Sequence, residues 1–589
     1  MSLAGQASLL PVAVVVLLGG ALVALVAGRW KARAPGVVAA FASACSGALL
    51  AGIAPAVYGG HLLVHRLGGW APLHGTVLAV GWAADPFGLT YALIVCFACA
   101  AIGLAGSDET AGFAARESGQ LWCLVLLLEA GLVGAALTAD LFNLFVWFEL
   151  ASVASYGLTA FHLERPSALE AGFKIVVLTT MAGFLIFTGI GLLYGHFGAL
   201  NFGQLHAAIA AQGHLGMAGN VGIALVVAGF ATKAGLVPFH AWLPDAHSAA
   251  PGPVSALFSG VMVGMGVLAI ARIAAVVVPA GISSLHGALM IIGLGSAIVG
   301  SALAFAQDDL KRLLAYDTIA QMGMVTIAIA TGTAKGDAGA TWHLLNHGVF
   351  KTLLFLVAGA IVHLTGTQKL SDMGGLGRRY PLLAGAFVVG ALAIIGVPPL
   401  NGYASRLLIH GALVDQRDYV ALAIVIVAEA LSAAALIRAA WMAFFAPPPQ
   451  AWPITLGRLR PATVAVFAAL AGACLAFGLA PARWLAGMAA PAAAVLHDPS
   501  RYAAAVTATT GHAVLFRSVV IPGSFVSSEV LLSTTAVVVV GALAARWRLR
   551  SDRELAPIRL LRSLHTGSVN DYAGYLVIGV VGLVAALLR

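Results

Sequence analysis

GNVGIALVVAGFATKAGLVPFH, residues 219–240, decides the fold class of this chain, because it combines a membrane-length apolar run with two features that interrupt it. An apolar run of about 18 or more residues is typical of a transmembrane helix. Lipid offers the backbone no hydrogen-bond partner, so such a run must bond to itself as a helix. Pro238 lacks a backbone donor and opens the helix just over one turn after Lys233. The stretch therefore predicts a broken membrane helix with a buried lysine beside the break.

The whole chain shares this apolar character. Of its 589 residues, 61% are hydrophobic and only 9% are charged, whereas soluble domains carry about 25% charged residues. The 69 glycines are expected where membrane helices pack closely through small residues. The composition excludes a soluble globular domain, and we predict an all-α polytopic membrane protein.

Hydropathy along the chain predicts about sixteen transmembrane helices, with the opening stretch as the seventh. The mixed segment 481–528 predicts an extramembrane excursion or helices that lie on a surface. The approximate limits of the sixteen helices are 8–27, 36–58, 85–106, 119–138, 141–161, 171–195, 219–237, 254–277, 285–306, 313–331, 340–364, 381–401, 419–445, 461–480, 529–545 and 571–588.

The distribution of basic residues predicts the orientation of these helices. With the N-terminus outside, most lysines and arginines fall in cytoplasmic loops, and the opposite loops hold scattered charges such as Arg66, Lys335 and Arg417. Enrichment of Lys and Arg in cytoplasmic loops is the rule for membrane proteins. We therefore expect both termini on the non-cytoplasmic side of a bacterial-type inner membrane. The net charge of +8 reflects this topology and does not indicate binding of nucleic acid.

The five cysteines give no sign of a redox cofactor. Cys96 and Cys99 form a CxxC pair, but it lies inside an apolar helix with no second pair nearby. Buried structural thiols explain such a pair, whereas a zinc or iron–sulfur site needs further ligands. We predict no cofactor and no metal in this chain.

A second helix is interrupted in the same way as the seventh. The predicted twelfth helix contains Pro398, Pro399 and Gly402 and lies five helices after the seventh. The two breaks would then occupy equivalent positions in two five-helix repeats, the second inverted, as in many transporters. This arrangement predicts four segments: helices 1–3 in residues 1–118, the first repeat in 119–277, the second in 285–445 and C-terminal helices in 446–589.

Two acidic residues and a lysine lie inside predicted helices of the first half. A charged group at a helix centre costs about 2.5–3.5 kcal/mol, so such groups indicate function. Glu129 lies in the fourth helix, Glu149 in the fifth and Lys233 in the seventh. A carboxylate and a lysine stabilise each other's charge, and their separation favours release of the lysine proton. We expect these residues to transfer protons.

The second half contains a stripe of ionisable residues. His343, His347 and Lys351 follow each other at intervals of four residues in the eleventh helix, which places them on one face. Histidine changes its charge near neutral pH and suits the intermediate steps of a relay. Asp317 and Gln321 share this spacing in the tenth helix, and we expect them to extend the relay. The competing interpretation is a set of satisfied hydrogen bonds between helices.

We expect other ionisable or polar residues, in loops or just past the first break, to serve as interfacial groups, anchors or lining instead of proton carriers. They are His240, Trp242, Asp245, His247, Asp308 and Asp309.

Three longer motifs resemble the antiporter-like subunits of the superfamily that includes complex I, group 4 membrane-bound hydrogenases and Mrp antiporters. They are ATKAGLVPFHAWLPDAHSAAP (231–251), DDLKRLLAY (308–316) and HLLNHGVFKTLLFL (343–356). The resemblance covers roughly residues 85–445. It implies a fourteen-helix core with two inverted five-helix repeats and broken helices 7 and 12.

By position, the resemblance identifies Glu149 and Lys233 as the family's carboxylate–lysine pair, and the eleventh-helix stripe as its central relay. The chain departs from the family in two places. The eighth helix has no ionisable residue in Val-Met-Val-Gly-Met-Gly (261–266). The twelfth carries Arg406 where relatives usually place lysine or glutamate. Arginine is always charged and does not carry protons, so Arg406 is expected to act as a fixed, modulating charge.

The resemblance implies a proton-translocating subunit of a redox-driven complex of the NADH–quinone oxidoreductase or group 4 hydrogenase type. Its expected partners are other membrane subunits, a peripheral soluble module, lipid and protons, with Na⁺ as an alternative ion. Two other functions stay open: a subunit of an Mrp-type Na⁺/H⁺ antiporter, and the proton-coupled membrane subunit of an inorganic-carbon uptake complex. The chain shows no redox site, so any enzymatic activity would belong to the complex.

Overall fold

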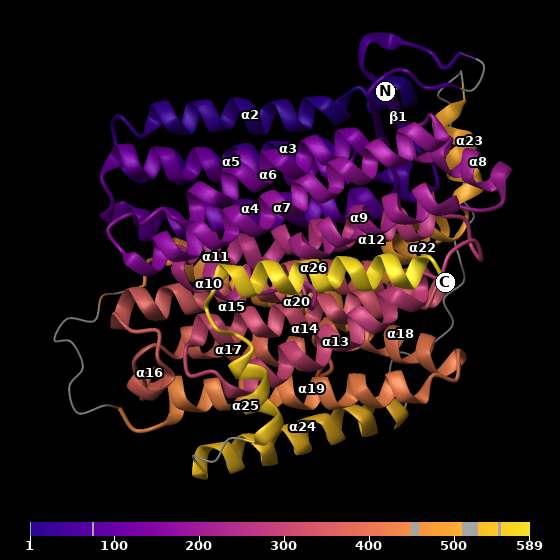
Figure 1. The fold of residues 1–589 in the computed structure, drawn as a ribbon. Helices are drawn as coiled ribbons and strands as arrows, with labels where there is room; N and C mark the ends of the chain where they lie inside the picture. Colours follow the sequence, from indigo (N-terminus) through magenta and orange to yellow (C-terminus); the bar gives the residue numbers. More distant parts are fainter. Residues whose placement is uncertain (1, 74–75, 449–456, 458, 509–527, 552–554) are drawn as a thin grey trace.

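In the computed structural model, the chain forms a bundle of helices that run along one common axis (Figure 1). The structure describes residues 2–73, 76–448, 457, 459–508, 528–551 and 555–589. Both termini lie at one end of the bundle, at the right in Figure 1, which we call the terminus end. We call the other end, where α16 (Leu376–Arg379) carries Arg378 and Arg379, the basic end.

The first eight membrane helices are long and mostly continuous, and the eighth contains two π-helical turns. The short α1 (Leu3–Ala7) precedes the first of them. They are α2 (Leu9–Ala27), α3 (Ala34–Tyr58), α4 (Pro86–Glu109), α5 (Ala115–Ala136), α6 (Leu141–Thr159), α7 (Pro166–Phe197), α9 (Gly216–Ala234), and a helix composed of α11 (Gly252–Leu257), η3 (Phe258–Met262), α12 (Val263–Ala271) and η4 (Arg272–Val277).

The second half of the bundle continues in the same manner. Its helices are α13 (Leu285–Ala306), α14 (Leu310–Ala330), α15 (Ala334–Thr365), α17 (Pro381–Ile395) with α18 (Gly402–Asp415), α19 (Tyr419–Ala440) with η6 (Trp441–Phe445), α20 (Pro461–Leu479), α24 (Ser528–Arg550) and α26 (Val569–Leu587).

The predicted fold class is confirmed. In the part of the chain that the structure describes, fifteen helices are long and apolar enough to cross a membrane, and α17 is a shorter apolar helix. With α17 and α18 as the broken twelfth helix, the count matches the sixteen predicted helices. The described strands form one small antiparallel ribbon, β1 (Leu63–Arg66) with β2 (Gly81–Ala84), at the terminus end.

The seventh and twelfth helices are both broken near their middle. α9 ends at Ala234, and the chain resumes as α10 (Trp242–Ala249) toward the basic end. α17 ends at Ile395, and the chain resumes as α18 toward the terminus end. The residues between the helices include Pro238 in the first break and Pro398 and Pro399 in the second. Proline cannot donate a helix hydrogen bond, which accounts for both interruptions.

α14 lies at the centre of the bundle, with every residue buried except Arg312. Glycine allows its close approach to α13: a Cβ atom at Gly300 would lie 2.5 Å from the backbone N of Ala320. A Cβ atom at Gly323 would lie 2.6 Å from the backbone N of Ala297. Small residues of this kind allow membrane helices to pack backbone against backbone. The contact fixes the helix that carries Asp317 and Gln321.

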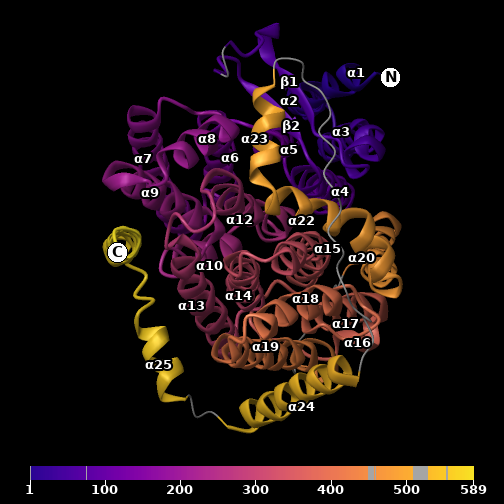
Figure 2. The ribbon, with the colours of Figure 1, turned by 90° about the vertical axis from the view of Figure 1, so that its right-hand side faces the viewer.

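Short helices cover the terminus end of the bundle (Figure 2). They are α8 (Phe202–Gln212), α21 (Pro481–Trp484), η7 (Leu485–Ala489), α22 (Ala490–His497) and α23 (Pro499–Thr507). Ala492, Val495 and Leu496 of α22 are buried in the core. Of the predicted extramembrane segment 481–528, residues 509–527 lie outside the described residues. The division of the chain into four segments also stays a prediction.

The C-terminal helices wrap around one side of the bundle (Figure 2). α24 packs along α19, the short α25 (Ala556–Ser563) lies near α13, and α26 reaches α9. There Gly579 of α26 lies against Pro238 and Phe239 of the first break. Short 3-10 turns at Leu67–Gly69, Thr110–Gly112 and Leu370–Asp372 complete the fold.

Candidate functional site

The first break positions Lys233 in the core, one residue before the end of α9. Its side chain has no exposed surface, and its Nζ donates a hydrogen bond of 3.2 Å to Ser152 Oγ on α6. The Phe148 ring lies beneath the ammonium group, 5.6 Å from Nζ to the ring centroid. The lysine thus takes a neutral hydroxyl as its hydrogen-bond partner.

Glu149 lies one helical turn before Ser152 on α6 and is half-buried. Its carboxylate lies against Gly183 of α7, where a Cβ atom would collide with Oε1. Lys233 is the basic residue that interacts electrostatically with this carboxylate. The structure therefore places the predicted carboxylate and lysine on facing helices, with the lysine bonded to the serine next to the carboxylate. We call Glu149, Ser152 and Lys233 the Lys233 site.

Lys351 on α15 forms a direct ion pair with Asp317 on α14. The distance from Nζ to Oδ2 is 2.5 Å, and neither side chain has exposed surface. Nζ also donates to the Leu314 carbonyl oxygen at 2.9 Å. A buried charge pair requires such additional hydrogen bonds to compensate for lost water.

The Asp317 carboxylate continues into a line of hydrogen bonds toward the second break. Gln321 Nε2 donates to Asp317 Oδ1 at 3.3 Å, and Gln321 Oε1 lies 3.1 Å from His343 Nε2. His343 Nδ1 lies 3.0 Å from Ser405 Oγ on α18. We call this connected set, Lys351, Asp317, Gln321, His343 and Ser405, the Lys351 file.

The file fixes the tautomer of His343. With its amide nitrogen on Asp317, Gln321 can only accept through Oε1, so His343 Nε2 carries a hydrogen. Ser405 Oγ also lies 3.0 Å from the Gly402 carbonyl oxygen. The hydroxyl can therefore donate either to His343 Nδ1 or to Gly402, and His343 can accept a proton on Nδ1 without losing Ser405 as a partner.

Arg406 follows Ser405 in the chain, but its guanidinium binds groups outside the Lys351 file. Its Nε donates to Glu429 Oε1 of α19 at 2.6 Å, Nη2 pairs with Oε2, and Nη1 donates to the Ile395 carbonyl oxygen at the end of α17. His410 Nε2 lies 3.0 Å from Glu429 Oε1. Arg406 is thus neutralised by Glu429 and satisfies a carbonyl group that the helix break exposes.

Two imidazoles lie around Lys351 without a complete set of hydrogen bonds. Among the described residues, His347 Nε2 and both ring nitrogens of His247 lack a well-aligned partner. His247 has no exposed surface and packs between Phe258 and Phe355, at 5.8 Å from each ring centroid. Lys351 is one of the charged groups that act on it. His247 therefore lies in the core, contrary to its expected interfacial position.

Polar groups of the eighth helix lie beside the file, although that helix has no ionisable residue at this depth. In its π-helical turn η3, Ser259 Oγ is 2.7 Å from Thr318 Oγ1 of α14. A Cβ atom at Gly260 would collide with Thr352 of α15, the neighbour of Lys351. Wide helical turns of this kind often occur at functional sites.

Comparison with protein families shows which family contains this arrangement of residues. A model of the family described as NADH:quinone oxidoreductase/Mrp antiporter, transmembrane, matches residues 138–432, half of the chain. This range includes both breaks, the Lys233 site and the Lys351 file. The chain belongs to this family.

Two relatives of this NADH:quinone oxidoreductase/Mrp antiporter chain represent the two branches in the family's description. An NADH-quinone oxidoreductase subunit from Desulforudis audaxviator is 34% identical over 418 residues, which cover 70% of this chain and 81% of the relative. A Na(+)/H(+) antiporter subunit from Bacillus subtilis is 30% identical over 444 residues, which cover 75% of this chain and 87% of the relative.

Solved structures agree with the family. A chain of the Mrp complex from Dietzia sp. DQ12-45-1b is 25% identical with a TM-score of 0.75, and the match covers 86% of this chain and all of that one. A chain of a membrane-bound sulfane sulfur reductase, an archaeal respiratory membrane complex, is 26% identical with a TM-score of 0.76, covering 85% and 99%. This antiporter-like chain is therefore similar to single subunits of multi-subunit membrane complexes.

Glu129 lies apart from both sites of this antiporter-like protein. Ser43 Oγ of α3 donates to Glu129 Oε2 at 2.6 Å. The thiols of Cys96 and Cys99, on α4, lie beside the same carboxyl group. No described interaction joins Glu129 to Glu149 or Lys233. No three His, Cys, Asp or Glu side chains in the described part of the chain converge as metal ligands.

Two residues of this region are not predicted from the sequence: Glu429 as a partner of Arg406, and His247 as a buried imidazole beside Lys351. Glu429 is a single carboxylate inside the apolar stretch 419–445, and a charged residue within a membrane helix is the sequence signal that could have identified it. His247 follows the first break by nine residues in a polar stretch that is typical of a loop. Its burial depends on α10 turning back into the bundle, which local sequence does not show.

Proposed function

We propose that this chain transfers protons as the antiporter-like component of a redox-driven membrane complex related to complex I. The observation that carries the proposal is the Lys351 file, an unbroken line of polar contacts through a region that is otherwise hydrocarbon. Isolated hydrogen bonds between helices would stabilise packing without linking an ionisable group to the second break. Intramembrane ionisable residues that face the bundle interior are typical of proton relays.

The geometry supports a relay in which charge pairs open and close. While Lys351 is paired with Asp317, the carboxylate favours the charged lysine. When Lys233 takes up a proton, or when a charged Lys233 loses Glu149 as its neighbour, the uncompensated positive charge disfavours the proton on Lys351. That proton then has imidazole acceptors on both sides: His347 and His247, with incomplete hydrogen bonds, and, at the far end of the file, His343, whose free acceptor is Nδ1.

The orientation follows from the loop charges. We assign the basic end to the cytoplasm of a bacterial-type cell, because arginine and lysine are enriched in cytoplasmic loops. The second break and α18 then lead from the file toward the non-cytoplasmic side. Arg406 remains charged beside Glu429 and does not itself carry protons; its proposed role is to hold the second break in place and modulate His343.

Similarity to known proteins is the basis for proposing the type of complex to which the chain belongs. The similarity to an oxidoreductase subunit and to a respiratory membrane complex supports a redox-driven assembly with further membrane subunits and a peripheral module. The similarity to a Na(+)/H(+) antiporter subunit and to an Mrp complex favours the second candidate, exchange of Na⁺ for H⁺ without electron transfer. Purification of the native complex and identification of its subunits distinguishes the two.

The proposal is tested by Lys233→Ala in the assembled complex. Proton translocation is measured in membrane vesicles with a pH-sensitive dye, and assembly is followed by native electrophoresis. We expect translocation to be abolished with assembly intact. Lys335→Ala is the matched control, since Lys335 pairs with Asp415 at the terminus end and should leave the rate unchanged. Normal translocation by the assembled Lys233→Ala complex would refute the proposal.

A further inference from the structure

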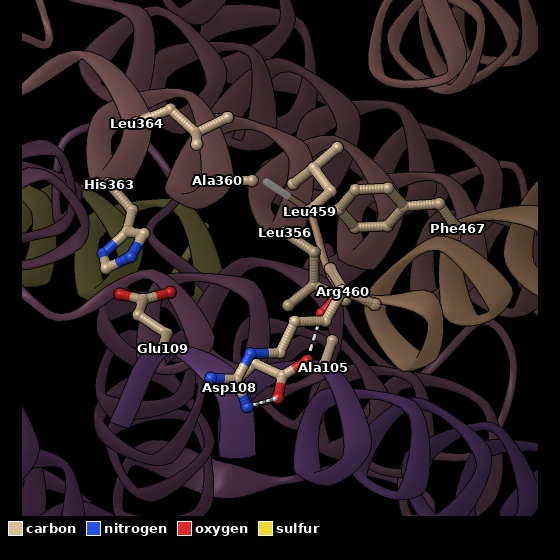
Figure 3. Close-up of a pocket in the computed structure, with 12 residues that line it drawn as sticks. Ala105, Asp108, Glu109, Leu356, Ala360, His363, Leu364, Leu459, Arg460 and Phe467 are labelled. Atoms are coloured by element: carbon tan, nitrogen blue, oxygen red, sulfur yellow. Dashed lines mark hydrogen bonds and ion pairs between the residues drawn. The ribbon is translucent and has the colours of Figure 1, made fainter. Parts of the chain in front are cut away.

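A cavity with polar side chains in a largely apolar lining lies at the basic end of the bundle, between α4, α15 and the start of α20 (Figure 3). Its volume is about 80 Å³, which leaves room for several water molecules. Asp108, Glu109, His363, Arg460 and Thr463 form its polar lining. None of these residues belongs to the Lys233 site or to the Lys351 file.

Asp108 has a fixed position in this cavity. Its carboxylate pairs with Arg460 Nη1 at 3.2 Å and accepts a hydrogen bond of 2.9 Å from Thr463 Oγ1. Both partners lie at the start of α20, so Asp108 connects α20 to the end of α4. These contacts hold the carboxylate in place, and Asp108 is an anchor.

Glu109 has a different environment. Its Oε1 accepts a hydrogen bond of 3.0 Å from the backbone N–H of Gly252, the first residue of the eighth helix. In Figure 3 its carboxylate lies below the ring of His363, which is exposed to solvent. A Cβ atom at Gly252 would lie 2.6 Å from Glu109 Oε2, so glycine leaves the room that this carboxylate occupies.

Lys311, just outside the cavity lining, lies about one helical turn before Leu314 of α14, whose carbonyl oxygen accepts a hydrogen bond from Lys351. Lys311 and His363 are the basic residues near enough to interact electrostatically with Glu109. Lys311 is buried, and its Nζ donates to the Ala250 carbonyl oxygen at 2.6 Å. This hydrogen bond fixes the turn that follows His247. Both Lys311 and Lys351 interact electrostatically with the His247 ring.

We propose that Glu109 is the group that takes up protons from water at the basic end of the molecule. A proton from cavity water binds a carboxylate oxygen and later leaves toward the interior, so only O–H bonds form and break. Exposed His363 relays protons at the rim, and Lys311 and His247 are buried deeper in the bundle. The inference rests on the proposed function, because it names the entrance of the same route.

Capping of the eighth helix is the competing role of Glu109. A cap requires only an acceptor oxygen for the Gly252 N–H. Glu109→Gln keeps that oxygen and the shape of the side chain but removes the exchangeable proton. The substitution therefore separates the two roles: a cap tolerates it, and a proton-uptake group does not.

The test is proton translocation by the assembled complex carrying Glu109→Gln, with Asp108→Asn as the matched control in the same cavity. A positioned acid–base group accelerates proton transfer by about 10²-fold or more, so we expect a loss of at least about tenfold with Glu109→Gln. Asp108→Asn should change the rate by less than about twofold. Wild-type rates with Glu109→Gln, while Lys233→Ala still abolishes translocation, overturn this inference and leave the proposed function intact.

A second measurement does not depend on transport. Glu109→Cys is introduced after replacement of the five native cysteines, and vesicles are treated with a small, charged methanethiosulfonate. We expect modification of Cys at position 109 from the side of the basic end, and none of a control Thr326→Cys in the buried part of α14. An unreactive thiol at position 109 overturns the proposal whatever the transport assay shows.

Discussion

The Lys233 site and the Lys351 file each bury a lysine in the core of the helix bundle, but they provide it with different partners. Lys351 is locked to a carboxylate at 2.5 Å, and its pair continues through Gln321. Lys233 is bonded to Ser152 at 3.2 Å, with Glu149 one turn away and half-buried. A relay that opens and closes charge pairs needs both arrangements. The molecule contains them at the same time, one in each half.

Because of this difference, we expect substitutions at the two sites to affect stability and transport to different extents. A buried ion pair that loses one partner leaves an uncompensated charge, which costs about 3–5 kcal/mol. A lysine bonded to a neutral hydroxyl does not depend on a single partner in this way. Substitutions that break the Lys351–Asp317 ion pair should therefore affect folding, whereas substitutions at the Lys233 site should affect transport with a small change in stability.

The largest effect is expected for Asp317→Asn, which leaves Lys351 charged in the core. We expect a loss of about 3–5 kcal/mol in the free energy of unfolding, measured as thermal unfolding of the solubilised complex. Glu149→Gln is the comparison at the Lys233 site, with less than about 1 kcal/mol expected.

The double variant Asp317→Leu with Lys351→Met removes both charges and should recover most of that stability, because an apolar replacement of a buried pair is often neutral. An equal loss for Asp317→Asn and Glu149→Gln would contradict the comparison.

A smaller effect on stability is expected for Glu429→Gln. The guanidinium of Arg406 would lose its counter-charge but keep the Ile395 carbonyl oxygen as an acceptor. Loss of a charged hydrogen-bond partner costs about 1.5–3 kcal/mol. Asp415→Asn is the control, since its pair with Lys335 is partly exposed and worth less than about 1 kcal/mol. Thermal unfolding of the complex again provides the measurement, and equal losses for the two variants would argue against a structural role of Glu429.

Much of this arrangement follows from the sequence. The apolar runs and the prolines predicted the sixteen membrane helices and both breaks, because membrane-length hydrophobicity and missing backbone donors act locally. The four-residue spacing of His343, His347 and Lys351 also placed them on one face of α15 from helix geometry alone.

The partners of these residues depend on contacts between distant helices. Asp317 was expected only to extend the relay, yet it is the counter-charge of Lys351. The pairing requires α13 and α14 to approach through Gly300 and Gly323, and this packing sets which face of α14 meets α15. Spacing within one helix carries no information about that contact.

An intermediate effect on transport is expected for Gln321→Leu, which interrupts the Lys351 file between Asp317 and His343. The two charges of the ion pair are retained, so assembly should be unaffected. We expect proton translocation to fall by about tenfold, the equivalent of about 1.4 kcal/mol in the barrier.

Thr326→Val on the same helix is the matched control, because among the described residues the Thr326 hydroxyl bonds to the Met322 carbonyl oxygen of α14 alone. An unchanged rate with Gln321→Leu would mean that protons bypass the glutamine through water.

The smallest effect is expected for Ser152→Ala, which removes the hydrogen-bond partner of Lys233. One such bond contributes about 1 kcal/mol, so translocation should change by about fivefold or less, and stability by about 1 kcal/mol. Ser155→Ala is the control on the same helix, since the Ser155 hydroxyl bonds to the Ser152 carbonyl oxygen at 2.7 Å and not to the lysine.

The direction of the change in rate with Ser152→Ala is informative. Without the hydroxyl, Glu149 is the charged group that still interacts with Lys233, and a tighter pair would hold the lysine proton and slow transport. A loss of stability as large as that of Asp317→Asn would show that Ser152 is an indispensable partner, and the two lysines would then be held in equivalent ways.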